Sequence, residues 1–140
     1  MKRRWVIPDT HGCVKTVEAL FNDLIKPTRY DEFYFLGDYI DRGPDSKGVV
    51  NFIRNLQKDE YNVTALKGNH EDMAVELYDA ENSGEGGWLN LFGNKKQSAW
   101  LQMGGRETLK SYGVSRAKDL PDDHIEWMRA LPYFAELDKF

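Results

Sequence analysis

The sequence predicts an α/β fold in which a mostly parallel sheet is connected by crossover helices. Short apolar or aromatic runs alternate with helical patterns through the first half of the chain, and each run stops near glycine or proline. Strand–helix–strand repeats of this kind are typical of parallel sheets with right-handed crossovers. With 140 residues, of which 41% are hydrophobic and 30% charged, the chain has the length and composition of one globular domain.

Runs of apolar and aromatic residues predict the strands. Three such runs are each followed within two residues by glycine or proline: Trp5–Ile7, Glu32–Leu36 and Tyr61–Leu66. We expect the first of them to be buried in the domain. The pattern of Tyr133–Leu137 is compatible with the start of a fourth strand.

Apolar residues three and four positions apart predict the helices. The first helix runs from Val14 through Leu24 on this pattern and ends before Pro27. The second follows Asp45, whose side chain is typical of a helix N-cap, and carries a continuous apolar face. A third helix is expected over Glu71–Tyr78.

The second half of the chain predicts a loop and further helical segments. Ser83–Gly87 is polar and rich in glycine, so we expect a mobile loop there. Two short helical patches follow around Trp100 and Leu109, divided by Gly104 and Gly105.

A last helix is expected between Pro121 and Pro132, with Ile125 and Met128 on its apolar face. It contains His124, which follows no strand and belongs to no recognisable motif. We therefore interpret His124 as an ordinary residue of the helix surface.

Composition and charge exclude several classes of partner. The net charge is −4 and the basic residues form no block, which argues against a nucleic acid or an anionic membrane as partner. No apolar run approaches the roughly 20 residues that a membrane span requires. The one cysteine, Cys13, cannot form a disulfide within the chain, which fits a reducing compartment, and we expect a cytoplasmic protein.

Polar loops follow each of the three predicted strands, at Asp9–Gly12, Gly37–Gly43 and Gly68–Glu71. In an open parallel sheet the loops at the carboxyl ends of neighbouring strands meet at one edge. The residues that would converge there are Asp9, His11, Asp38, Asp41, Arg42, Asn69 and His70. Carboxylate, imidazole and amide oxygen together suit Mn, Fe or Zn better than Ca or Mg.

Each loop alone has a simpler interpretation. A turn and a helix N-cap would explain Asp9–Gly12, and Gly68–Glu71 suits a helix start. The loop Gly37–Gly43 is more specific, and the spacing of Asp38 and Asp41 does not match an EF-hand. The three loops in order favour one shared site. Phosphate-binding glycine motifs of nucleotide-binding domains are absent from the sequence.

The three loops together resemble the calcineurin-like metallophosphoesterases, and within them the phosphoprotein-phosphatase branch. The first family motif, Gly-Asp-x-His-Gly, stands here with Pro8 in place of the first glycine. The second and third motifs match fully at Gly37–Gly43 and Gly68–Glu71. The segment Trp100–Gly113 is similar to the bacterial members, which include Ser/Thr protein phosphatases and symmetrical diadenosine tetraphosphatases.

The resemblance implies two divalent transition metals, with Mn expected first and Fe or Zn as alternatives. It implies that one cation is bound by Asp9, His11 and Asp38, and a second by Asp38 and Asn69. It further implies that Arg42 holds the phosphate, where a planar guanidinium gives bidentate contact. His70 would protonate the leaving oxygen, oriented by Asp41.

The resemblance also implies a fold and its extent. The expected fold is the N-terminal part of an αββα sandwich, with the second sheet largely missing. The family pattern continues with further histidines, so we expect residues 1–140 to form a metallophosphoesterase domain that is incomplete at its C-terminus. The second cation would then be weakly held, and a sheet surface left uncovered would favour self-association.

The function that these observations predict is metal-dependent hydrolysis of phosphate esters. A dinuclear site would supply a metal-bound hydroxide that attacks the ester in line with the leaving group. The substrate would be a phosphorylated protein or, alternatively, a dinucleoside polyphosphate, and we expect selectivity to depend on loops within Asn82–Lys96. A different alternative is a metal-poor, inactive fragment that serves as a partner-binding module.

Overall fold

The structure, a computed structural model, describes residues 1–84 and 88–138, with the backbone alone for 88–93. It confirms the predicted α/β class. A parallel three-stranded sheet has the order β1-β2-β3, and its strands are β1 (Arg4–Ile7), β2 (Glu32–Phe35) and β3 (Asn62–Ala65). Each strand coincides with one of the three predicted runs.

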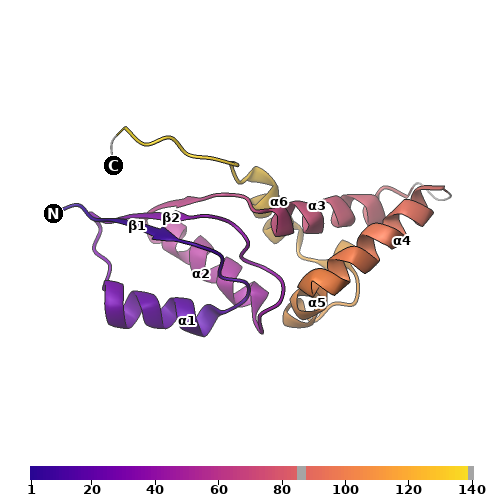
Figure 1. Ribbon diagram of the computed structural model, residues 1–140, viewed down its shortest axis with the longest axis horizontal. Helices are drawn as coiled ribbons and strands as arrows, with labels where there is room; N and C mark the ends of the chain where they lie inside the picture. Colours follow the sequence, from indigo (N-terminus) through magenta and orange to yellow (C-terminus); the bar gives the residue numbers. More distant parts are fainter. Residues whose placement is uncertain (85–87, 139–140) are drawn as a thin grey trace.

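Helical segments account for most of the remaining chain (Figure 1). Those between the strands are α1 (Val14–Ala19), its continuation η1 (Leu20–Ile25) and α2 (Ser46–Lys58). Those after the strands are α3 (Asn69–Asn82), α4 (Trp88–Trp100), η2 (Leu101–Gly105), α5 (Arg106–Tyr112), η3 (Ala117–Asp119) and α6 (Asp122–Ala130). Asp45 caps α2 as predicted, because its Oδ1 accepts a hydrogen bond of 2.8 Å from the Gly48 amide.

Helices α1 and α2 lie on the same side of the sheet (Figure 1). Successive right-handed crossovers between neighbouring strands place their helices on one face. Phe33 and Phe35 of β2 point to that face and are fully buried. On the opposite face Val6 is 57% exposed, so the prediction of a buried first strand holds for Ile7 and is wrong for Val6.

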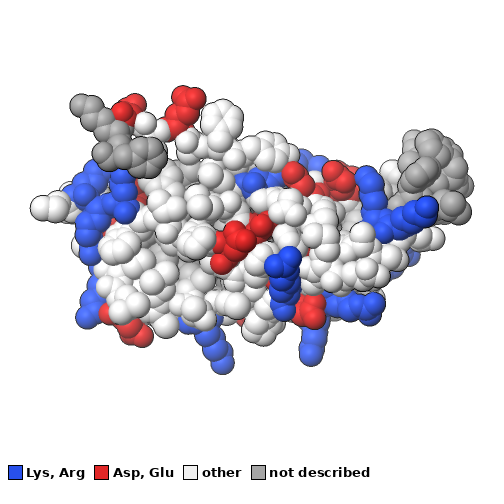
Figure 2. Space-filling model, viewed as in Figure 1, with Lys and Arg blue, Asp and Glu red and all other residues white. Residues whose placement is uncertain are grey.

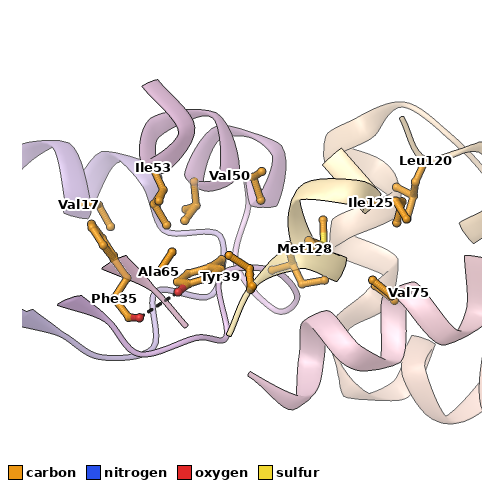
Figure 3. Close-up of a cluster of buried hydrophobic side chains, with 14 of the residues drawn as sticks. Val17, Phe35, Tyr39, Val50, Ile53, Ala65, Val75, Leu120, Ile125 and Met128 are labelled. Atoms are coloured by element: carbon orange, nitrogen blue, oxygen red, sulfur yellow. Dashed lines mark hydrogen bonds between the residues drawn. The ribbon is translucent and has the colours of Figure 1, made fainter. Parts of the chain in front are cut away.

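The apolar core has two parts that Tyr39 joins (Figure 3). One part lies between the sheet and α2 and includes Phe35 and Ile53. The other lies between α3 and α6 and includes Val75 and Met128. The Tyr39 hydroxyl donates a hydrogen bond of 2.6 Å to the Leu66 carbonyl, and burial raises the pKa of Tyr39, so the phenol stays neutral in the core.

The first predicted helix changes its winding half way along. From Leu20 it continues as the π-helix η1, in which each turn holds an extra residue. The apolar face therefore shifts by one position, so Ile25 is buried whereas Leu24, assigned to that face from sequence, is 76% exposed.

Three expectations for the second half need correction. Tyr133–Leu137 forms no strand. The third helix extends to Asn82. Within Asn82–Lys96, expected to be loop, helix α4 already begins at Trp88. The predicted loop Ser83–Gly87 lies partly outside the described residues, whereas the division of two helical segments at Gly104 is confirmed by its φ of 110°.

The interpretation of His124 as a surface residue is wrong. Its side chain is buried, with 6% exposed, and its Nδ1 lies 2.7 Å from the Tyr112 hydroxyl of α5. Burial, reinforced by the charge of Arg54, lowers the pKa of His124. A neutral imidazole with one polar partner can replace an apolar residue in this contact between α5 and α6.

The molecular surface agrees with the modest net charge. On the face seen in Figure 2, Lys and Arg side chains lie mainly around the rim, and acidic side chains also appear near the centre. Within residues 1–84 and 88–138, none of the helices combines the length and apolar character that a bilayer crossing needs.

Candidate metal centre and phosphate site

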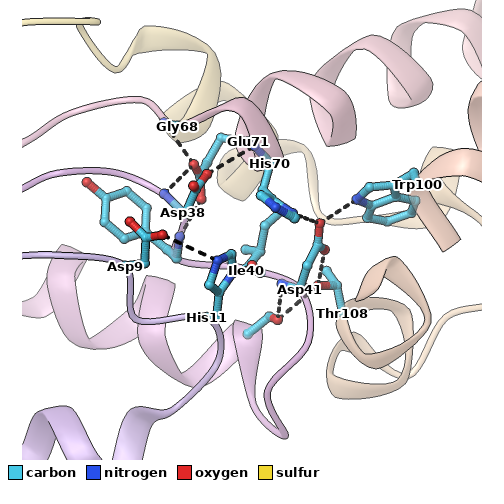
Figure 4. Close-up of polar contacts among 12 residues, drawn as sticks. Asp9, His11, Asp38, Ile40, Asp41, Gly68, His70, Glu71, Trp100 and Thr108 are labelled. Carbon is cyan, nitrogen blue, oxygen red and sulfur yellow. Dashed lines mark hydrogen bonds and ion pairs between the residues drawn. The ribbon is translucent and has the colours of Figure 1, made fainter. Parts of the chain in front are cut away.

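The loops that follow the three strands converge at one edge of the sheet, as predicted (Figure 4). The first loop is bonded to the second, because the amides of Thr10 and His11 donate to the Asp38 carbonyl at 3.2 and 3.0 Å. The second is bonded to the third, because the His70 amide donates to Asp38 Oδ1 at 3.1 Å. Asp38 is therefore the residue through which all three loops are connected.

Four of the predicted site residues have left-handed backbone conformations. The φ angles are 35° for His11, 56° for Asp38, 73° for Asp41 and 68° for Arg42. Such conformations cost of order 1 kcal/mol or more in residues with a Cβ and persist only where surrounding contacts enforce them. Their concentration in two adjacent loops indicates that these loops are shaped for function.

The orientation of His11 suits a metal ligand. Its Nδ1 lies 2.8 Å from the carbonyl oxygen of Ile40, and a carbonyl can only accept, so Nδ1 carries the proton. In the neutral ring Nε2 then presents its lone pair, 3.7 Å from Asp9 Oδ2. Metal-binding histidines are usually fixed in this way by a hydrogen bond from the other ring nitrogen.

Potential ligand atoms of His11, Asp38 and His70 lie within 4.8 Å of one another. The rings of His11 and His70 meet edge to face with centroids 4.7 Å apart. Asp9 adjoins this cluster through His11, and its carboxylate is largely exposed. Asn69 is exposed and lies between Gly68 and His70, both of which contact Asp38. This set of imidazole, carboxylate and amide groups fits a transition metal.

The aspartate expected to orient His70 contacts it directly. Asp41 is fully buried, and its Oδ2 lies 2.7 Å from His70 Nδ1. The same carboxylate accepts hydrogen bonds from Trp100 Nε1 at 2.8 Å and from the Thr108 hydroxyl at 2.6 Å. Burial raises the pKa of Asp41, and the hydrogen bonds from Thr108, His70 and Trp100 oppose that rise.

Glu71 connects the second and third loops through hydrogen bonds to their backbone amides. Its fully buried carboxylate accepts hydrogen bonds from three backbone amides, those of Asp38 at 2.9 Å, Tyr39 at 2.6 Å and Gly68 at 3.0 Å. Burial raises the pKa of Glu71, and these amides act in the opposite direction. A Cβ at position 68 would collide with the Asp38 carboxylate, so only glycine allows this approach.

Arg42 lies beside the cluster with an exposed side chain. Its amide donates a hydrogen bond of 3.1 Å to the Gly104 carbonyl, which connects the second loop to η2. The side chain lines an open cavity of about 670 Å³ together with Met103 and Arg106. A cationic fork at the rim of such a cavity can receive an anionic group.

The sequence pattern of the calcineurin-like phosphoesterases matches residues 2–139. The chain belongs to this family. The resemblance carried by its three loop motifs is therefore confirmed.

Three relatives of this chain are bacterial proteins. Serine/threonine-protein phosphatase 1 of Salmonella typhimurium is 34% identical over 72% of this chain, and serine/threonine-protein phosphatase 2 of Escherichia coli is 34% identical over 88%. The symmetrical bis(5'-nucleosyl)-tetraphosphatase of Pectobacterium atrosepticum is 31% identical over 53%. The matches span 38%, 55% and 25% of these relatives, so the chain corresponds to about half of their length or less.

The fold of the phosphoesterase also agrees with a solved structure. A crystal structure of a protein provisionally named diadenosine tetraphosphatase superposes with a TM-score of 0.57 and covers 91% of this chain and 41% of that one. At 21% identity this likeness establishes the fold alone.

Three residues that contact the candidate site were missing from the sequence prediction: Glu71, Trp100 and Thr108. All three lie in segments that carried the family resemblance, so a signal was present. Their side chains look like ordinary helix residues in the sequence, and only the fold shows that they contact Asp38, Asp41 and Tyr39.

Proposed function

We propose that this chain belongs to a metal-dependent phosphatase that hydrolyses phosphate esters of serine or threonine in proteins. The observation that carries this proposal is the convergence of His11, Asp38 and His70 within 4.8 Å. Arg42, in the same loop as Asp38, adds an exposed cation that can contact a bound phosphate. The 34% identical relatives named as Ser/Thr phosphatases favour the phosphoprotein over other esters.

In this proposal Asp9, His11 and Asp38 hold the first cation, and Asp38 and Asn69 contribute to the second. When bound, two divalent cations neutralise the charge of a phosphate ester and supply hydroxide near neutral pH. The donor set suits Mn, which we propose as the metal, with Fe or Zn as alternatives. Two protein ligands hold a transition metal weakly, so the second position is expected to fill poorly.

The remaining site residues bind the phosphate and move a proton. Arg42 presents its guanidinium fork to two phosphate oxygens. His70 donates a proton from Nε2 to the leaving oxygen, while its Nδ1 proton stays on the hydrogen bond of 2.7 Å to Asp41. Cys13, which is exposed, plays no part, and its free thiol suits the cytoplasmic location that we propose.

A second candidate substrate is a symmetrical dinucleoside polyphosphate. Several relatives of this chain, 28–34% identical, are named symmetrical tetraphosphatases. The same residues would act, with a nucleoside diphosphate as the leaving group. Release of ADP from diadenosine tetraphosphate, compared with release of phosphate from a phosphoserine peptide, distinguishes the two substrates.

Hydrolysis of p-nitrophenyl phosphate in the presence of Mn²⁺ tests the proposal. We expect Mn-stimulated turnover by the chain that disappears in Asp38→Asn. Equal rates for the two proteins would overturn the proposal. Absence of Mn-stimulated turnover in the parent chain would favour the alternative of an inactive, metal-poor module.

A further inference from the structure

The Asp41 carboxylate is held by donors from distant parts of the chain. Trp100 ends α4 and Thr108 lies in α5, and they reach Asp41 across 59 and 67 residues of sequence. Both side chains are buried, with 1% and 0% exposed. Because both side chains are buried and bonded to Asp41, we expect them to influence the site through Asp41 and not by contact with metal or phosphate.

The hydrogen-bond directions around Asp41 form one consistent set. An indole N–H can only donate, so Trp100 fixes Oδ2 as an acceptor. Thr108 donates to Oδ1, and its oxygen accepts the Asp41 amide at 2.8 Å. Ser46 lies 2.9 Å from Thr108 and can donate to it, which leaves the Thr108 proton committed to Asp41.

This set determines what His70 can do. Both Asp41 oxygens already accept hydrogen bonds, Oδ2 from Trp100 and Oδ1 from Thr108, so the His70 nitrogen 2.7 Å from Oδ2 is assigned as a donor. Nδ1 therefore carries a proton, and the His70 ring lies beside His11 and Asp38 (Figure 4). A carboxylate held at both oxygens cannot rotate to present another edge to the ring.

We propose that Trp100 and Thr108 are positioning residues that fix the Asp41 carboxylate, and through it the ring orientation and the Nδ1 proton of His70. The inference rests on the proposed function for its catalytic meaning but on hydrogen-bond geometry for its structural part. It also gives a role to the packing of α4 and α5 against the loop Gly37–Gly43, which contains Asp41.

The structural part is tested on the metal-free chain by nitrogen-15 NMR of the His70 ring. In the parent protein we expect a protonated Nδ1 whose proton exchanges slowly with water. Trp100→Phe keeps an aromatic ring but removes the donor, and Thr108→Val keeps the shape but removes the hydroxyl. We expect each to speed exchange of this proton at least tenfold.

Two further variants control for damage to the fold. Ser111→Ala removes a hydroxyl from the same helix α5 that accepts from the Lys47 amide and donates to the Thr108 carbonyl but does not contact Asp41, so exchange should be unchanged. Thr108→Ser restores the hydroxyl and should recover slow exchange. Parent-like exchange in folded Trp100→Phe and Thr108→Val would overturn the inference, as would equal acceleration by Ser111→Ala. If Trp100→Phe does not fold, Thr108→Val decides alone.

The catalytic part is tested with two leaving groups on the Mn-loaded chain. Phenyl phosphate needs protonation of its leaving oxygen far more than p-nitrophenyl phosphate. Thr108→Val should lower kcat for phenyl phosphate about tenfold or more, with a smaller loss for p-nitrophenyl phosphate and little change in KM. Equal losses on both substrates would contradict positioning of His70. If the parent chain hydrolyses neither substrate, the proposed function fails while the exchange experiment still decides the structural part.

Discussion

Glu71 holds Asp38 by its backbone, with the Glu71 carboxylate 2.9 Å from the Asp38 amide. The same carboxylate also accepts hydrogen bonds from the amides of Tyr39 and Gly68, so the second and third loops are both bonded to one buried group. Asp38 in turn accepts the His70 amide. The position of the carboxylate that we propose as a metal ligand thus depends on a residue outside the proposed ligand set.

Replacement of this carboxylate should cost stability. In Glu71→Gln the amide group offers one oxygen to three N–H donors and places its own N–H₂ against at least one of them. We expect a loss of about 2 kcal/mol in the free energy of unfolding, measured by urea denaturation. Glu76→Gln on the same helix removes an exposed carboxylate that pairs with Lys96. This control should change the free energy of unfolding by less than about 0.5 kcal/mol. Similar losses in both would refute the role of Glu71.

Replacement of His70 separates proton donation from metal binding. His70 lies in the cluster with His11 and Asp38, so it has the position of a ligand as well as that of an acid. If it acts as the acid, His70→Asn lowers kcat by roughly 10²–10⁴ and leaves the Mn content unchanged. Metal analysis of the purified variant decides, since a parallel fall in Mn content would make His70 a ligand.

Gly104 should be intolerant of a side chain. Its φ is 110°, and a Cβ there would collide with the backbone of Arg42. We expect Gly104→Ala to destabilise the fold by roughly 2–4 kcal/mol. Gly113→Ala is the control, because φ is 68° but no atom lies within 4 Å of the added carbon, and about 1 kcal/mol is expected. Equal effects in thermal or urea unfolding would show that the contact with Arg42 is unimportant.

His124 should make stability depend on pH. Its pKa is lowered in the folded protein, so between the folded value and about 6.5 the unfolded chain binds more protons. The stability that this neutral histidine contributes is complete above about pH 6.5 and is lost as the pH falls toward the folded pKa. The difference in unfolding free energy between the parent and His124→Gln should therefore shrink on acidification. If the unfolding free energies of the parent and His124→Gln changed in parallel with pH, this role of His124 would be contradicted.

Much of this arrangement could be predicted from local sequence. The strands and most helices follow from apolar spacing, and the glycine and polar residues after each strand located the candidate site. Leu24 was misplaced because a periodic pattern assumes 3.6 residues per turn, whereas η1 winds more widely. His124 was misplaced because burial of a polar ring depends on its partner Tyr112, which local spacing cannot reveal.

The parts of the site that escaped prediction depend on tertiary contacts. Trp100 and Thr108 reach Asp41 only because α4 and α5 fold back beside the strand-end loops. Their residue types are unremarkable for buried helix positions. Contacts between residues this far apart in the chain require the packing of whole helices to be known.

The central claim is that Asp38 holds cations at the junction of the three loops, and binding of Mn²⁺ tests it most directly. Equilibrium dialysis or electron paramagnetic resonance should show one Mn²⁺ bound by the parent chain more tightly than a second. Asp59→Asn, an exposed aspartate at the end of α2, should bind like the parent. Asp38→Asn should lose both ions, and undiminished binding by this variant would contradict the account.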